Sequence, residues 1–449
     1  MSAASEMPVG RQLADFGSGL TLAAIPEAVV EKLRCSLLHN VACALAAYST
    51  GAEIWAVART GRGEESSLLC DGTRVPAEQA AFANGALMHT RAQDDTHMAA
   101  RTHVGASILP AALAVAEREG RDGAALITAA VAGCEIAAAI GERLASGVTA
   151  RGFRATPVFG TLGAAVAAAS ILRLDAIATS NAIAIAAGFS AGLNQTWIDG
   201  SSEYRLQPAM AARNGVLAAD LAAAGFTGAA RWYEGVAGFA RAFADGDPHA
   251  GESWLLGERW RLLDVIYKPY PVCAIMQSPV SVALALASEH DLDPAQITRI
   301  RVHLNPDDHR YPGTVNPGPY HEISASLMSA EFCVAMALSN RSATLEGLSD
   351  FDNPTILRLI ELTDVIPDPG IPSLGGRIGV DLAAGGTLQA ELVPEPSTYG
   401  WDWDGVVANA TRMRPEMAIG SACLTSLIDA IATLETTADV GALVRMTAA

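Results

Sequence analysis

The fold class is decided by the stretch DGAALITAAVAGCEIAAAIGERLAS, residues 122–146. Alanine and glycine occupy most positions between its large aliphatic side chains, so a helix formed here can approach its neighbours closely on several faces. Four other stretches have the same composition, at residues 76–90, 105–120, 161–174 and 175–189. This pattern is typical of a multi-helix core and not of amphipathic helices around a sheet. We therefore expect a mainly α protein whose residues 1–262 form a large all-helical domain.

The second half of the chain contains strands with alternating polarity. Residues 297–304 read ITRIRVHL and place Ile300, Val302 and Leu304 on one face, with charged or polar side chains on the other. Residues 377–393 repeat the alternation on both sides of an Ala-Gly-Gly turn. Such a turn between two alternating segments predicts a β-hairpin.

Helices are expected beside these strands, at about residues 275–290 and 325–339. Together these elements predict a smaller α+β domain over residues 263–399. The pattern of residues 400–449 is helical again, and we expect this segment to return to the large domain. A length of 449 residues agrees with two domains, because it exceeds that of an ordinary single domain.

The charge of the chain disfavours two classes of partner. It contains 48 acidic and 30 basic residues, which gives a net charge of −18, and half of its residues are apolar. A strongly acidic protein repels nucleic acids and anionic membranes, so we expect neither as a partner. A small anionic substrate stays compatible with this charge, because a local basic pocket can exist within an acidic surface.

The cysteines and the apolar segments predict a cytoplasmic protein that does not span a membrane. No CxxC pair occurs among the seven cysteines, which are Cys35, Cys43, Cys70, Cys134, Cys273, Cys333 and Cys423. An odd, unclustered set indicates reduced thiols and not a disulfide framework or a zinc site. The N-terminus shows no secretory signal pattern. Polar residues interrupt the apolar segments 155–172 and 176–193, so both are expected to be buried helices.

Known nucleotide-binding and zinc-protease motifs are missing from the sequence. Neither GxGxxG nor GxxxxGK[ST] occurs, and HExxH is absent too. We therefore expect no nucleotide-binding site and no zinc-protease site.

Four polar islands interrupt the helical stretches, at residues 89–103, 151–160, 201–215 and 267–279. They contain the candidate site residues His89, Arg91, Asp94, Asp95, Thr96, His97, Arg101, His103, Arg151, Arg154, Thr156, Tyr204, Arg205, Arg213, Lys268, Tyr270 and Gln277. Cations from several islands can converge on carboxylate groups, which arginine binds in bidentate fashion.

Each island also has a purely structural interpretation. An Asp-Asp-Thr sequence beside a helix is most often a helix cap. His103 could be a hydrogen-bonded structural histidine, and Arg154 or Arg205 could cap helix C-termini or pair with surface acids. The acids and histidines of residues 94–103 show no spacing specific to a divalent metal, so we expect no metal site.

The order of the islands and of the segments between them resembles the MmgE/PrpD family. The matching segments are NGALMH, DDT, GASILPAALAVAE, AGCEIAAAIG, GFTG and KPYPVC, spread over about residues 30–395. The family includes 2-methylcitrate dehydratase, cis-aconitate decarboxylase and iminodisuccinate epimerase. The resemblance implies a cofactor-independent, homodimeric enzyme with a large helical domain and a smaller α+β lid domain. Its active site would lie between the domains and accept a small di- or tricarboxylic acid.

Several site residues of the family match positions of this sequence. Asp94, Asp95 and Thr96 match the family's Asp-Asp-Thr. His103 matches the histidine of the family's His-Pro-Gly/Ser element, and Lys268 matches the lysine of Lys-Pro-Tyr-Pro.

Other positions depart from the family pattern. Ala92 stands where the resemblance implies an aspartate, and Arg154 replaces the histidine of Gly-Phe-His. Tyr204 replaces a lysine, Gln277 a histidine and Phe332 a tyrosine. These departures argue against the usual dehydratase and decarboxylase activities, while Arg154 and Tyr204 keep the site polar.

The resemblance implies a reaction at a carbon next to a carboxylate. We expect His103 to act as general base or acid, because an unperturbed histidine pKa near 6.5 suits proton transfer at neutral pH. Asp94 or Asp95 would orient it, and Tyr204 or Lys268 would donate a proton on the opposite face of the substrate. We expect the substrate to be bound by Arg154, Arg205, Asp95, Thr96, His97 and Gln277, with Lys268 helping to neutralise the developing charge.

The replaced positions favour an epimerase acting on an iminodisuccinate-like polycarboxylate. A dehydratase of the 2-methylcitrate type or a decarboxylase of the cis-aconitate type is the alternative. A third possibility is a catalytically silent family member that binds a carboxylate or serves as a scaffold.

Overall fold

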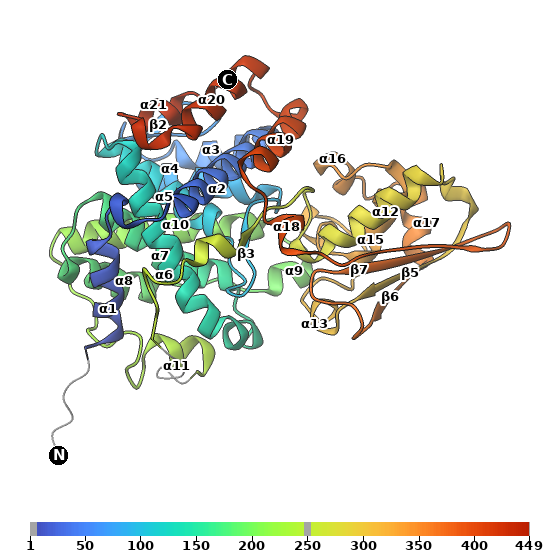
Figure 1. Cartoon of the computed structure of the whole chain (residues 1–449), viewed down its shortest axis with the longest axis horizontal. Helices are drawn as coiled ribbons and strands as arrows, with labels where there is room; N and C mark the ends of the chain where they lie inside the picture. The colour runs from blue at the N-terminus through green and yellow to red at the C-terminus, as the bar shows by residue number, and fades with distance from the viewer. Residues whose placement is uncertain (1–6, 247–252, 449) are drawn as a thin grey trace.

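Helices make up most of the chain in the computed structural model, which describes residues 7–246 and 253–448. The helical unit contains α1 (Val9–Gly19), α2 (Glu27–Ala46), α3 (Ala52–Ala58), α4 (Ala77–Thr90), α5 (Val104–Arg118), α6 (Gly123–Ala150), α7 (Ala155–Ile171), α8 (Ala176–Phe189), α9 (Gln195–Asp199), α10 (Leu206–Ala223) and α11 (Phe239–Ala244). Figure 1 shows this unit beside a smaller unit that contains a sheet.

The central helices α6 and α7 pack with their backbones in direct contact. A Cβ atom added to Gly133 would lie 2.5 Å from the carbonyl oxygen of Gly163, and one added to Gly163 would lie 2.7 Å from that of Gly133. Only glycine fits at both positions, which explains the small-residue composition of residues 122–146. Among the described helices, α6 alone is long and apolar enough to cross a membrane, but 83% of its most apolar window is buried within the protein.

The helical unit is not all-helical, in contrast to our expectation. Two pairs of very short antiparallel strands occur in it, β1 (Ser66–Ser67) with β2 (Arg74–Val75) and β3 (Thr96–His97) with β4 (Val265–Ile266). Two-residue strands carry no periodicity that a sequence pattern can reveal. The β3–β4 pair joins the first polar island to the segment just before Lys268.

The smaller unit, here called the sheet unit, extends from α12 to α18. Its strands are β5 (Ile297–Leu304), β6 (Thr363–Pro367), β7 (Gly376–Leu382) and β8 (Thr387–Leu392), in the order β6-β5-β7-β8. Its helices are α12 (Gln277–Glu289), α13 (Pro306–His309), α14 (Ile323–Ser326), α15 (Ala330–Asn340), α16 (Leu345–Leu348), α17 (Pro354–Glu361) and α18 (Pro396–Tyr399). Only the β5–β6 pair is parallel.

The sheet agrees with the alternation seen in the sequence. Ile300, Val302 and Leu304 of β5 are fully buried, whereas Arg301 lies on the other face and pairs with Asp381 of β7 at 2.6 Å. The predicted hairpin is confirmed as β7 and β8. Its turn needs glycine, because both Gly385 and Gly386 have positive φ angles, of 87° and 93°.

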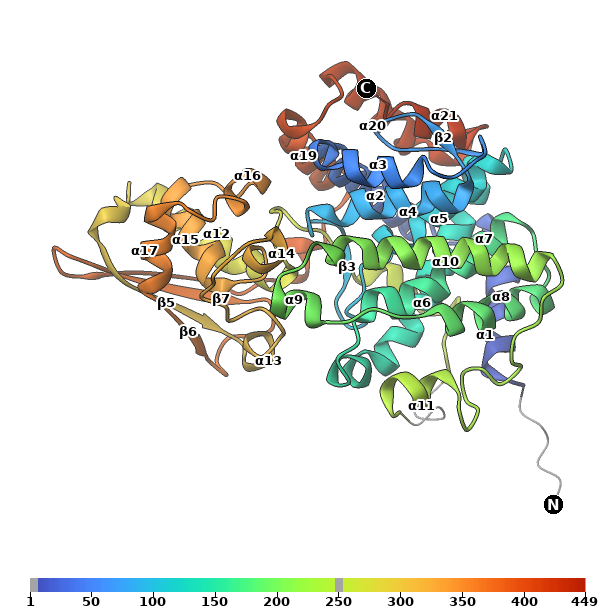
Figure 2. The same cartoon turned by 180° about the vertical axis from the view of Figure 1, so that it is seen from behind.

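The C-terminal helices α19 (Trp403–Met413), α20 (Ser421–Ala432) and α21 (Val440–Arg445) pack on the helical unit, against α2 and α5. Figure 2 shows them above α2 and α3, at the end of the molecule away from α11. Their apolar side chains belong to the same buried cluster as α2, α5 and α6, whereas those of the sheet unit belong to a second cluster that also includes Ala92, Trp197 and Tyr204. The chain therefore leaves the helical unit after β4 and comes back to it after α18.

Candidate active site

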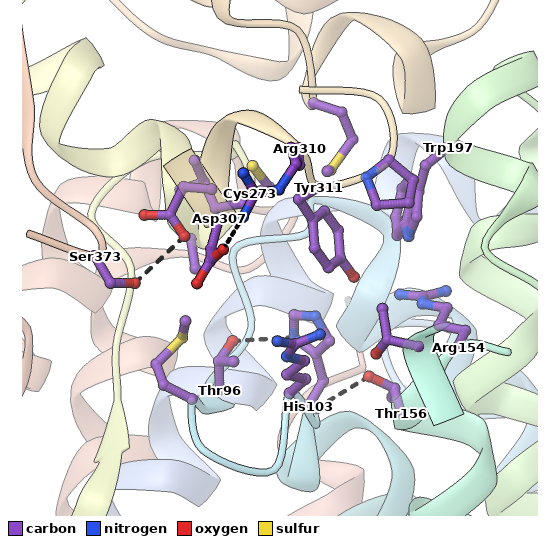
Figure 3. Close-up of a pocket in the computed structure, with 18 of the residues that line it drawn as sticks. Thr96, His103, Arg154, Thr156, Trp197, Cys273, Asp307, Arg310, Tyr311 and Ser373 are labelled. Carbon is purple, nitrogen blue, oxygen red and sulfur yellow. Dashed lines mark hydrogen bonds and ion pairs between the residues drawn. The ribbon is translucent and has the colours of Figure 1, made fainter. Parts of the chain in front are cut away.

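A pocket of about 790 Å³ lies between the two units, and both contribute polar side chains to it. Those from the helical unit are His89, Thr96, Arg101, His103, Ser146, Thr149, Arg154 and Thr156. Those from the sheet unit are Asn305, Asp307, Asp308, Arg310, Tyr311 and Ser373. Figure 3 shows the two walls facing each other, with His103, Thr156 and Arg154 on one side and Tyr311 and Arg310 on the other.

The loop between α4 and α5 forms the floor of the pocket and is tightly held. Ala92 has a positive φ angle of 49°, which turns the chain sharply after α4. The carboxylate of Asp95 then accepts a hydrogen bond from the Gly105 backbone N–H at 2.8 Å, and β3 pairs with β4. The Lys268 ammonium donates a hydrogen bond to the Ala92 carbonyl from below. These contacts fix the residues between them in one conformation.

His103 stands at the start of α5 with its Nδ1 atom turned into the protein. Three acceptors lie near this atom, at 3.2 Å for Asp94 Oδ2, 3.1 Å for the Asp95 carbonyl oxygen and 3.2 Å for Thr96 Oγ1. A carbonyl oxygen can only accept, so Nδ1 carries the proton and donates. In the neutral ring, Nε2 therefore keeps its lone pair. The His103 side chain is 17% exposed and lines the pocket, which makes Nε2 available there as a base.

Asp94 connects His103 to a second histidine. Its Oδ2 atom lies 2.9 Å from Nδ1 of His89, whose Nε2 lies 2.5 Å from Nη2 of Arg154. The other carboxylate oxygen of Asp94 lies 3.8 Å from the Lys268 ammonium. Four ionisable side chains thus follow one another from Arg154 through His89 and Asp94 to His103.

The charges of this cluster follow from burial and from its own members. Burial alone would raise the pKa of Asp94, but His103, His89 and Lys268 outweigh it and hold this pKa well below the usual range. Burial lowers the pKa of His89 to about 3 and lowers that of His103 too, against the opposing effect of Asp94. At neutral pH, Asp94 is therefore a carboxylate and both histidines are neutral.

Arg154 remains a cation at the edge of the pocket. Burial lowers its pKa to about 10, which still leaves it protonated at neutral pH. Its guanidinium lies 4.5 Å from the centre of the Trp197 ring, and Nη1 donates to the Tyr204 carbonyl oxygen at 2.6 Å. The stacking and the hydrogen bonds hold its planar group in place, as carboxylate recognition requires.

Tyr204 and Arg205 are among the predicted site residues that lie outside the pocket lining. The Tyr204 hydroxyl donates to the Thr90 carbonyl oxygen and is buried, so in this structure it does not face the pocket. Arg205 lies 3.5 Å from Glu53 on the outer side of the helical unit. Sequence order places both near Arg154, but the 3-10 turn at Ser202–Arg205 directs their side chains elsewhere.

Three others hold the backbone around the site. Gln277 bonds the backbone of the segment 270–273 through both ends of its amide. His97 is buried behind the loop, with its Nε2 3.8 Å from Glu142 Oε1. Asp95 binds the Gly105 backbone, and burial raises its pKa to about 6. None of these three side chains belongs to the pocket lining.

The sheet unit contributes residues that the sequence did not single out. Arg310 and Tyr311 directly follow α13, and Figure 3 shows the Tyr311 hydroxyl directed toward the side of the pocket that holds His103 and Arg154. Burial raises the pKa of Tyr311 above its usual value, so its proton is retained at neutral pH. The only signal in the sequence is the polar segment HRYPGT at residues 309–314, after a strand.

Within residues 7–246 and 253–448, two groups of side chains have the composition of a metal site. The ligand atoms of His89, Asp94 and His103 lie within 4.8 Å of one another, as do those of His97, Glu142 and Asp264. A positive group already adjoins each set. Arg154 and Lys268 contact the first, as described above, and Arg259 bridges the two acids of the second at 2.8 and 3.0 Å. This charge disfavours an added cation at either place.

Comparison with known families agrees with the resemblance noted in the sequence. Residues 11–251 match the MmgE/PrpD N-terminal domain, and residues 270–397 match the MmgE/PrpD C-terminal domain. The two matches correspond closely to the part of the helical unit that precedes β4 and to the sheet unit.

Related proteins extend the comparison to named enzymes. The chain is 26% identical to cis-aconitate decarboxylase of Aspergillus terreus, over 77% of this chain and 74% of that protein. It is 25% identical to the cis-aconitate decarboxylase-like protein oryM of Aspergillus oryzae, over 98% and 97%. Human cis-aconitate decarboxylase is 27% identical over 70% and 67%. Two matched domains in the family's order, and relatives along almost the whole chain, show that this protein belongs to the MmgE/PrpD family.

Proposed function

We propose that this protein is a cofactor-independent enzyme that removes a proton from a carbon next to a carboxylate of a small di- or tricarboxylic acid. The observation that carries the proposal is the orientation of His103. Its Nδ1–H is held by Asp94 and the Asp95 carbonyl, so the unprotonated Nε2 is available to the pocket. A base held in one tautomer and one orientation is what such a proton transfer needs.

Cationic side chains around the pocket support an anionic substrate. Arg101 and Arg154 line it on the helical side and Arg310 on the other. Removal of a proton beside a carboxylate places two negative charges on one group, and fixed cations stabilise that state by several kcal/mol. We assign substrate carboxylates to Arg154 first, because its guanidinium is already oriented by Trp197 and Tyr204.

Tyr311 is the proposed proton donor on the opposite side. Its neutral hydroxyl projects from the sheet unit toward the side of the pocket that holds His103. This role replaces the one that the sequence suggested for Tyr204, whose hydroxyl is engaged by the backbone. Lys268 is fully buried and outside the pocket lining, so it acts through Asp94 and the loop and not on the substrate.

Two reactions fit this arrangement. The neutral His103 and a second proton-bearing group across the pocket favour epimerisation of an iminodisuccinate-like acid, in which one face loses a proton and the other gains one. The names of the relatives favour a lyase, and cis-aconitate decarboxylation is therefore the second candidate. None of the relatives named above is an epimerase.

The deciding experiment is incubation of the protein in D2O with iminodisuccinate, cis-aconitate and 2-methylcitrate, followed by NMR. Deuterium at the carbon next to the carboxylate, without loss of water or CO2, supports the epimerase. Release of CO2 from cis-aconitate would instead identify a decarboxylase. Formation of an olefin from 2-methylcitrate would identify a dehydratase. A complete lack of exchange and turnover supports a silent, carboxylate-binding protein. Full exchange by His103→Gln would refute the base assigned here.

A homodimer in the cytoplasm completes the proposal. The resemblance supports the dimer, and seven free thiols support a reducing compartment. Light scattering after gel filtration tests the dimer, because a monomeric mass at micromolar concentration would contradict it.

A further inference from the structure

His89 is a buried titratable side chain that the proposed reaction does not use. Its ring is fully buried, lies 4.7 Å from the ring of His103 and borders the pocket. Arg154 approaches one ring nitrogen at 2.5 Å and Asp94 approaches the other at 2.9 Å. A histidine with two short, opposite contacts connects the group that binds the substrate to the group that orients the base.

The direction of each hydrogen bond is fixed by the chemistry of its partners. A guanidinium only donates, so Nε2 of His89 accepts from Arg154. The proton of the neutral ring is then on Nδ1, which donates to the Asp94 carboxylate. Asp94 in turn accepts from Nδ1 of His103. One arrangement of protons therefore satisfies the whole series and selects the tautomers of both rings.

We infer that His89 is a positioning residue that couples carboxylate binding at Arg154 to the proton affinity of His103. This inference rests on the proposed function, in which Arg154 receives a carboxylate. A bound carboxylate draws the guanidinium charge toward itself and weakens the Arg154–His89 hydrogen bond. The Nδ1–H of His89 is then a weaker donor to Asp94. Asp94 keeps more of its negative charge for His103, whose Nε2 becomes a stronger base when substrate is present.

Other charged and titratable groups face this series and stay in place when His89 alone is changed. They are Lys268 after β4, Tyr204 before α10 and Tyr311 after α13. The direct electric field of a bound anion also raises the proton affinity of His103. The test therefore compares variants that differ only in which ring nitrogen of His89 they replace.

Asparagine and glutamine offer this comparison. The amide of Asn places a donor near the position of Nδ1, and so retains the contact with Asp94 but not that with Arg154. The amide of Gln reaches the position of Nε2 and retains an acceptor for Arg154 but no donor for Asp94. Both remove the ring, so a role limited to packing predicts similar effects for the two. His290→Gln, at an exposed position after α12, is the matched control for loss of a histidine.

The first measurement needs no turnover. Two-bond 1H–15N spectra of 15N-histidine-labelled protein report the tautomer and the pKa of His103 with and without propane-1,2,3-tricarboxylate. We expect the tricarboxylate to raise this pKa by about half a unit more in the unaltered protein than in His89→Asn. Equal increases in the two proteins would overturn the coupling, even if the enzyme proves active. If the tricarboxylate binds but no substrate is turned over, the proposed function is contradicted. The comparison of the two pKa increases still tests the coupling, because it needs no turnover.

The second measurement uses the substrate that the D2O experiment identifies. We expect His89→Gln to move the acidic limb of the pH profile to higher pH, since Asp94 loses a competing donor and the pKa of His103 rises. His89→Asn should mainly raise KM, because Arg154 loses the acceptor that orients it. Unchanged thermal unfolding of both variants shows that the fold is retained. Equal losses of kcat in both, without a shifted limb, would reduce His89 to a packing role.

Discussion

The two walls of the pocket differ in how firmly their charges are held. On the helical side, Asp94 and Lys268 are fully buried, and Asp94 has partners on several sides. On the sheet side, Arg310 and Asp307 pair with each other while their side chains are 69% and 80% exposed. Exposed pairs of this kind contribute little and rearrange easily, whereas buried groups keep one geometry. The comparison indicates that the charged groups of the helical wall keep a fixed geometry, whereas the exposed charges of the sheet wall can rearrange.

The largest expected difference between the walls concerns two aspartates. Asp94→Asn should lower kcat by about 10³-fold, because an amide no longer holds His103 in the required tautomer. Asp307→Asn removes an exposed carboxylate and should change kcat less than about threefold. Steady-state kinetics on the identified substrate measure both. Similar losses in the two variants would contradict the division between the walls.

A buried cation should also contribute more to the free energy of unfolding than an exposed one. Lys268→Met leaves Asp94 without its buried cation and should lower the free energy of unfolding by about 3 kcal/mol. Arg299→Met removes an exposed partner of Asp364 on the outer face of the sheet and should cost less than about 1 kcal/mol. Urea denaturation followed by circular dichroism gives both values. A loss for Lys268→Met no greater than that for Arg299→Met would show that the cluster does not depend on this lysine.

Two tyrosines are candidates for the proton donor: the sequence suggested Tyr204, and the structure supports Tyr311. Tyr311→Phe should lower kcat by about 10²-fold, because the opposite wall loses its proton donor. Tyr204→Phe should retain most of the turnover and lower stability by about 1 kcal/mol, because it loses a buried hydrogen bond to Thr90. Kinetics and thermal unfolding of the pair separate the roles. The reverse pattern would restore Tyr204 as the donor.

The smallest effect expected is on the pH dependence. His103 must be neutral to accept a proton, and its pKa lies below the usual 6.5 because of burial. The value of kcat/KM should therefore be constant above pH 6.5 and fall by about tenfold per unit only at lower pH. A decline that begins above pH 7 would mean that Asp94 raises the proton affinity of His103 more than burial lowers it.

Much of the fold follows from local patterns, but the pairing of distant segments does not. The alternation around Val302 and the Gly385–Gly386 turn predict β5 and the hairpin, since strand faces and turn conformations depend on neighbouring residues. Strand β6 escaped notice because it is five residues long, ends in a proline and is only partly buried. The two-residue pairing of β3 with β4 arises only in the folded chain.

The candidate site could likewise be predicted only in part from the sequence. The ordered islands point to His103, Asp94, Arg154 and Lys268, which the structure brings together in one cluster. Spacing does not reveal that Arg205 and Gln277 are engaged elsewhere, since that depends on the direction of each side chain. Tyr311 could not be found from spacing, because its place opposite His103 depends on how the two units meet.

The pairing of β3 with β4 also bears on the order in which the protein can mature during synthesis. Thr96 pairs with Ile266, and Arg91 pairs with Glu416 at 2.6 Å, so the floor of the pocket is closed by segments that the ribosome makes much later. A nascent chain that ends before Ile266 contains the loop between α4 and α5 but not the strand that pairs with it. The pocket floor is therefore completed only near the end of translation, and a fragment with the helical half alone would contain this loop without its later partners.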